Sequence, residues 1–138
     1  MTPAPRSSAS ASVGQPVRMP WALLLDLVLV IVFAAIGRAS HAEQNAVLGA
    51  LSTAAPFLVG TLAGWALVRA RSRSWPLTVG TGIPVWLSTL GLGMLLRVLF
   101  GGSTAVSFIL VAGAALAILL LGWRWVASWW ARRAAQRG

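Results

Sequence analysis

Cysteine, lysine and tyrosine are absent from this sequence of 138 residues, and its titratable groups besides arginine are one histidine and two carboxylates: Asp26, His41 and Glu43. Without cysteine there is no disulfide, no thiolate nucleophile and no thiolate metal site. The two side chains His41 and Glu43 are too few to hold a metal ion, and a haem would lack an axial ligand. We therefore expect no metal site and no cofactor.

Charge is also scarce, at 9% of residues, whereas 58% of residues are hydrophobic and the mean hydropathy is +0.82. This composition is typical of membrane proteins. The net charge of +9 comes entirely from arginines, which lie at the ends of apolar segments. Anionic lipid headgroups explain that placement, so we expect the bilayer as a partner and no nucleic acid. The use of arginine without lysine suggests a GC-rich bacterial genome.

The apolar residues form four blocks long enough to cross a bilayer. Because the links between them are short, neighbouring helices must be antiparallel. Residues 1–19, rich in Pro, Ser and Ala, are predicted to be a disordered cytoplasmic tail. Residues 127–138 are predicted to be a basic, aromatic segment lying at the membrane surface. The sequence thus predicts an all-α, polytopic, antiparallel four-helix bundle over 20–126, with transmembrane helices at about 20–37, 46–68, 77–100 and 104–126.

Arginine placement predicts the orientation of this bundle. Arginines lie before the first helix (Arg6 and Arg18), between the second and third (Arg69, Arg71 and Arg73) and after the fourth (Arg132, Arg133 and Arg137). The opposite side offers Arg38 alone, partly offset by Glu43. By the positive-inside rule both termini are cytoplasmic, in the inner (plasma) membrane. Seven of the eight tryptophans fall at the same predicted end, which is independent support. The alternative is that the first helix is a signal peptide cleaved near Ser40-His41-Ala42.

Asp26 is a carboxylate inside an apolar span, where an isolated charge costs on the order of 2–3 kcal/mol at the helix centre. Its depth lies near the cytoplasmic side, so we expect it to meet Arg124 or Arg69, whose helices end there. Two interpretations stay open for this inner polar site. Asp26 is either a structural ion pair or a proton or cation site.

Arg97 is predicted at the opposite end of the membrane, which separates it from Asp26. It should meet an outer polar cluster of Arg38, His41 and Glu43, with Glu43 as its counter-ion. Arg97 either extends to the outer headgroups or contacts an anion or a quinone headgroup.

Small residues on the second helix indicate close helix packing. Pro56, Gly60 and Gly64 recur at intervals of four residues, and Gly60 and Gly64 form a G-x-x-x-G motif that lets backbones approach. An alternative is that Pro56 and Pro84 expose carbonyl groups to a substrate or ion.

Catalytic constellations are not found. Asp26 and His41 fall at opposite faces of the membrane, so they cannot form a hydrolytic triad. No glycine-rich phosphate loop follows a predicted strand. We expect a protein that is not an enzyme.

Three segments resemble a bacterial and archaeal membrane family, the domain of unknown function 3054 family. They are DLVLVIVFAAIGRASH (26–41), PFLVGTLAGW (56–65) and WLSTLGLGMLLRVLFGGSTAVSFILVAG (86–113). The resemblance covers about residues 21–125 and implies a four-helix membrane protein without an established activity. It also indicates that Asp26, Arg38, His41 and Arg97 are the positions to test.

Two functions are compatible with these features. The first is a non-enzymatic accessory or lipid- or quinone-binding subunit of a membrane complex, whose partner is another membrane protein or a second copy of the chain. The alternative is a small proton-coupled transporter that uses Asp26.

Overall fold

The computed structural model of the chain describes residues 18–39 and 45–138, and the regular structure in these residues is helical throughout. Each of the four helices is long and apolar enough to cross a membrane. The prediction of an all-α protein with four such helices is therefore confirmed. The helices are α1 (Arg18–Ala39), α2 (Ala46–Ser72), α3 (Val79–Leu99) and α4 (Val106–Gln136).

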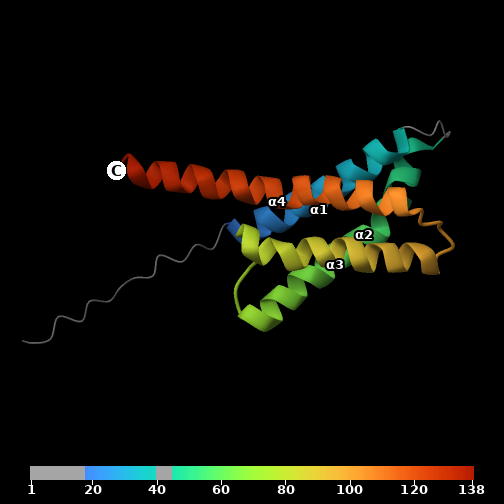
Figure 1. Cartoon of the computed structure of the whole chain (residues 1–138), viewed down its shortest axis with the longest axis horizontal. Helices are drawn as coiled ribbons and strands as arrows, with labels where there is room; N and C mark the ends of the chain where they lie inside the picture. Colours follow the sequence, from blue (N-terminus) through green and yellow to red (C-terminus); the bar gives the residue numbers. More distant parts are fainter. Residues whose placement is uncertain (1–17, 40–44) are drawn as a thin grey trace, which may run out of the picture.

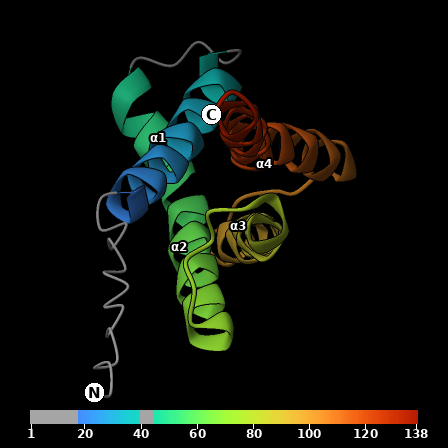
Figure 2. The same ribbon diagram turned by 90° about the vertical axis from the view of Figure 1, so that its left-hand side faces the viewer.

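Consecutive helices run in opposite directions along the long axis of the molecule (Figure 1). Helix α1 packs against α2 and α4, and α3 packs against the same two helices. Helices α1 and α3 lie diagonally opposite one another and do not pack together, which the view in Figure 2 makes visible. The start of α1, the α2–α3 link and the end of α4 lie at one end of the bundle. We call this the inner end, and the opposite end, which holds the α3–α4 link, the outer end.

The α2–α3 link is set by local hydrogen bonds at both of its ends. Helix α2 continues past the predicted end at residue 68 and stops at Arg73, whose φ of 53° is left-handed and whose N–H bonds the carbonyl of Arg69. Helix α3 starts at residue 79, because the side chains of Thr78 and Thr81 each accept the other's backbone N–H. This reciprocal capping box satisfies two N–H groups that would otherwise lack partners.

The α3–α4 link is longer than the predicted residues 101–103. Gly101 adopts a φ of 84°, which favours glycine, and the N–H of Gly102 bonds the carbonyl of Arg97 at 2.9 Å. Ala105 is extended, and α4 begins at Val106.

Helix α4 continues without a break to Gln136, so residues 127–136 extend the fourth helix, and their place at the membrane surface stays a prediction. Its 31 residues span roughly 46 Å, more than the hydrocarbon thickness of about 30 Å. Figure 1 shows α4 projecting past the other three helices at the inner end. At the other terminus α1 begins at Arg18, and the predicted disordered tail otherwise lies outside the described residues.

Helices α2 and α3 approach closely along the predicted small-residue stripe. A Cβ atom added to Gly60 would lie 2.7 Å from the carbonyl oxygen of Ser88, and one added to Gly64 would lie 2.8 Å from Cα of Val85. Ser88 also donates a hydrogen bond to the Gly60 carbonyl at 2.8 Å. Gly60 and Gly64 thus lie where the two backbones come close together, while Pro56 is buried within α2.

The bundle interior is divided into a central apolar cluster and a smaller one at the inner end. The central cluster contains Val30, Phe57, Met94, Ala112, Leu116 and Leu120. The smaller cluster contains Ala22, Trp65, Val68 and Val85.

Candidate functional site

Asp26 of α1 lies at the inner end with no solvent-exposed surface. Its Oδ1 accepts hydrogen bonds from Nε1 of Trp123 at 2.8 Å and Nη1 of Arg124 at 2.9 Å. Its Oδ2 accepts from Nε1 of Trp65 at 2.8 Å and Nη2 of Arg124 at 2.6 Å. The carboxylate is thus held by four donors from α2 and α4. We call Asp26, Trp65, Trp123 and Arg124 the inner charge centre.

Arg124 of α4 is as fully buried as Asp26, and it also contacts the α2–α3 link and α3. Its Nε donates to the carbonyl of Pro76 in the α2–α3 link at 2.8 Å, and Nη1 also donates to the carbonyl of Leu120. A Cβ added to Gly82 of α3 would lie 2.6 Å from Cδ of Arg124, so only a residue without a side chain fits there. Helices α1, α3 and α4 and the α2–α3 link therefore converge on this one side chain.

Of the two arginines expected as partners of Asp26, only Arg124 binds it in the structure. Arg124 forms the ion pair. Arg69 instead lies with its guanidinium carbon 4.9 Å from the centre of the Trp75 ring and donates to the carbonyl of Arg73. Because both carboxylate oxygens are paired and fully buried, the inner charge centre fits a structural ion pair better than an open proton or cation site.

The positions of Trp65 and Trp123 predict interfacial residues only, and no pattern in the sequence indicates directly that they bind Asp26. Trp65 is almost completely buried, and the indole N–H groups of both rings point to the carboxylate. The available signal was depth, since both tryptophans lie at the same end of their helices as Asp26. A buried indole needs an acceptor, and a carboxylate at that depth is the strongest one.

The outer end contains the two arginines that were predicted for the outer polar site. Nη1 of Arg38 donates to Oγ1 of Thr53 at 3.4 Å. Nε of Arg97 donates to the carbonyl of Ser103 at 3.3 Å, and its guanidinium lies 4.8 Å from the centre of the Phe108 ring. The expected partners His41 and Glu43 lie outside the described residues.

Arg38 and Arg97 line one cavity of about 480 Å³, to which all four helices contribute. We call it the outer cavity. Most of its wall is apolar, and the guanidinium groups are its only charged side chains among the described residues. Its lining residues are Phe33, Ala34, Gly37, Arg38, Thr53, Arg97, Ser107, Phe108, Val111 and Ala112.

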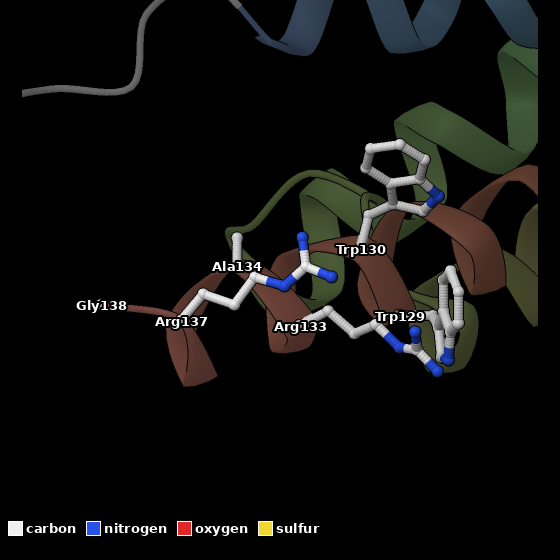
Figure 3. Close-up of a pocket in the computed structure, with 6 residues that line it drawn as sticks. All are labelled: Trp129, Trp130, Arg133, Ala134, Arg137 and Gly138. Carbon is white, nitrogen blue, oxygen red and sulfur yellow. The ribbon is translucent and has the colours of Figure 1, made fainter.

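A third feature is a hollow of about 570 Å³ on the projecting end of α4. Figure 3 shows its aromatic and basic residues, with the Arg133 guanidinium beside the ring of Trp129. The distance from this guanidinium to the ring centre is 4.1 Å. Trp129, Arg133 and Arg137 are exposed, so this surface combines aromatic rings with charge in the manner of a membrane interface.

No group of three or more histidine, cysteine or acidic residues that could hold a metal ion occurs within residues 18–39 and 45–138. The polar side chains of these residues are therefore mainly guanidinium groups, indoles and hydroxyls, with the paired carboxylate of Asp26.

Comparison with known proteins gives one finding. The family model described as "Protein of unknown function (DUF3054)" matches residues 23–127, which include α2 and α3, most of α1 and α4, the inner charge centre and the outer cavity. The comparisons with curated proteins and with solved structures give no match.

Proposed function

Because the chain belongs to the protein family of unknown function DUF3054, we propose a function from its site geometry: a non-enzymatic accessory protein of a bacterial inner membrane that binds a lipid or quinone. The single observation that carries this proposal is the outer cavity. It joins apolar side chains to the guanidinium groups of Arg38 and Arg97. Ligand sites of this kind are mostly apolar, with a few polar groups that orient the ligand.

The volume of about 480 Å³ lies within the range of roughly 300–1,000 Å³ typical of small-molecule sites. A hydrocarbon chain or a quinone ring can contact the apolar part of the wall, which includes Phe33, Phe108 and Val111. The two arginines can bind its polar group. An amphiphilic molecule satisfies both parts of this wall at once.

The inner charge centre supports an accessory role over transport. A proton or cation carrier must be reached by water, whereas Asp26 has no exposed surface and accepts four hydrogen bonds. Opening this site would separate α1 from α2 and α4. The geometry therefore favours a fixed structural pair over the alternative of a proton-coupled transporter.

The proposed orientation places both termini in the cytoplasm. The inner end contains Arg69, Arg71 and Arg73 on α2 and its link, and the end of α4 adds Arg132, Arg133 and Arg137. Such an excess of arginine marks the cytoplasmic side. The exposed Trp129 and the arginines near it then lie at the level of anionic headgroups, which we propose as a bilayer contact. A further membrane protein or a second copy of the chain is the proposed protein partner.

Mass spectrometry of lipids and quinones extracted from the protein, purified in a mild detergent, tests this function. We expect an amphiphile retained at about one molecule per chain. Val111→Trp should displace it, because Val111 lines the outer cavity. Leu110→Trp is the matched control, since Leu110 is similarly exposed but does not line the cavity. Absence of any retained amphiphile, or equal retention by both variants, would disprove the proposal.

A further inference from the structure

The outer cavity receives its two guanidinium groups from helices that do not pack on one another. Arg38 comes from α1 and Arg97 from α3, the diagonal pair of the bundle. Both side chains are half-buried and line the same volume. A ligand in this cavity therefore meets cationic groups from two different directions.

Close glycine contacts position each guanidinium. A Cβ at Gly49 would lie 2.3 Å from Nη2 of Arg38, so the guanidinium lies directly against the α2 backbone. A Cβ at Gly102 would lie 2.8 Å from Cγ of Arg97. Such packing restricts both side chains before any ligand arrives and lowers the entropy lost on binding.

The donors of Arg97 are oriented by its contacts. Its Nε is committed to the Ser103 carbonyl, and its guanidinium plane lies near the Phe108 ring. The two terminal nitrogens are therefore the donors that can serve a ligand. A guanidinium presented in this way forms paired hydrogen bonds with an oxyanion.

Charge at the outer end also favours an anion. The sequence places Arg38 and Arg97 against a single acid, Glu43, on this side. The other carboxylate of the chain, Asp26, is bound to Arg124 at the inner end. Even with Glu43 counted, the outer end keeps a positive balance, and the apolar wall strengthens its attraction for an anion.

The geometry selects among anions and polar headgroups. The oxygens of a phosphate point in several directions, so one phosphate can accept from two guanidinium groups on different sides. The two oxygens of a carboxylate lie in one plane and suit a single guanidinium fork. A quinone ring carries carbonyl oxygens without a charge and so adds no negative charge to the positive outer end.

We infer that the outer cavity is a phosphate site, in which Arg38 and Arg97 hold the anionic headgroup of a phospholipid while Phe33, Phe108 and Val111 contact its acyl chain. This inference rests on the proposed function of the outer cavity as an amphiphile site. It narrows the ligand class to phosphate-bearing molecules with a net negative charge.

The test is native mass spectrometry of the full chain released from lipid nanodiscs containing equal amounts of phosphatidylglycerol and phosphatidylcholine, with and without added ubiquinone. We expect phosphatidylglycerol to be retained in preference to the other two. Arg38→Gln and Arg97→Gln should each weaken its binding about tenfold to a hundredfold, the loss of one charge-assisted contact. Arg132→Gln is the matched control, because it removes an exposed arginine at the inner end.

A second set of measurements keeps the inference falsifiable if an arginine variant does not fold. Val111→Trp leaves both guanidinium groups in place and should still reduce phosphatidylglycerol binding. Glycerol phosphate at millimolar concentration distinguishes the ligand source. Displacement of the lipid would indicate a soluble phosphate, and retention would indicate the lipid headgroup.

The outcomes separate the two proposals. Retention of ubiquinone in preference to phosphatidylglycerol would overturn the phosphate inference and leave the proposed function intact. Unchanged phosphatidylglycerol binding in folded Arg38→Gln and Arg97→Gln variants would overturn the inference as well. Absence of all three amphiphiles from the wild type would reject both.

Discussion

Asp26 and Arg124, 98 residues apart in the chain, form a two-pronged ion pair in which each carboxylate oxygen accepts from a different terminal nitrogen, at 2.9 and 2.6 Å. Neither side chain has exposed surface. The pair fixes the inner ends of α1 and α4 in register. Arg124 extends this restraint to the α2–α3 link through the carbonyl of Pro76.

Asp26→Asn is expected to destabilise the bundle by about 3–5 kcal/mol, because it leaves the Arg124 guanidinium buried without a counter-charge. Unfolding in detergent, followed by circular dichroism, measures this change. The double variant Asp26→Leu with Arg124→Met should recover only part of the loss, since it removes both buried charges but leaves the indole N–H groups of Trp65 and Trp123 without their acceptor.

The same substitution separates the structural role from transport. If Asp26→Asn is as stable as the wild type and instead abolishes ligand-dependent proton release, the transporter alternative is correct. We expect the opposite result. The wild type should show no ligand-dependent proton release, and Asp26→Asn should lower its stability.

Trp65→Phe and Trp123→Phe should each cost about 1–3 kcal/mol, because each keeps an aromatic ring but removes an N–H donor from Asp26. The unfolding measurement is the same. Trp125→Phe is the control, since Trp125 is exposed and outside the inner charge centre. Equal stability of all three variants would contradict the hydrogen-bond geometry.

The ion pair was partly predictable from the sequence, and the reason is depth. In antiparallel helices, distance from the helix end brings Asp26 to the level of Arg124 and separates it from Arg97. Arg69 lies at a similar depth and was an equally possible partner of Asp26 on that ground. The choice between Arg69 and Arg124 depends on how each helix is rotated about its own axis. That rotation depends on packing details such as the space at Gly82, which fits the Arg124 side chain.

Helix ends were less predictable, because apolar composition does not encode them. Helix α3 begins where Thr78 and Thr81 cap each other, a local hydrogen-bond pattern within an otherwise unremarkable polar link. Helix α4 continues to Gln136 because no proline or glycine interrupts residues 123–136. The tryptophans and arginines of residues 127–136 indicate a membrane interface but do not indicate whether the helix breaks before them.

Gly60→Ala and Gly64→Ala are expected to destabilise the α2–α3 contact by about 1–3 kcal/mol each, the cost of overpacking. Each added Cβ would meet α3 backbone atoms at less than 3.0 Å, and a backbone cannot move aside as a flexible side chain can. Gly91→Ala is the matched control, because no atom lies within 4 Å of its Cβ position. A destabilisation by Gly91→Ala equal to that by Gly60→Ala would show that loss of glycine, and not the contact with α3, sets the cost.

The proposed orientation can be tested directly because the chain has no cysteine, so that each introduced thiol is unique. Ser74→Cys in the α2–α3 link and Ser103→Cys in the α3–α4 link are both exposed and lie at opposite ends of the bundle. With an impermeant maleimide applied to intact spheroplasts, we expect labelling of Ser103→Cys alone, since the arginine-rich inner end faces the cytoplasm. Lysis should make both cysteines reactive, which would confirm that Ser74→Cys was shielded by the membrane and not by the fold.

The reverse pattern, with Ser74→Cys labelled in intact spheroplasts, would show that the topology is inverted. It would also move the outer cavity with Arg38 and Arg97 to the cytoplasmic leaflet, so the same experiment decides from which leaflet a phospholipid headgroup enters.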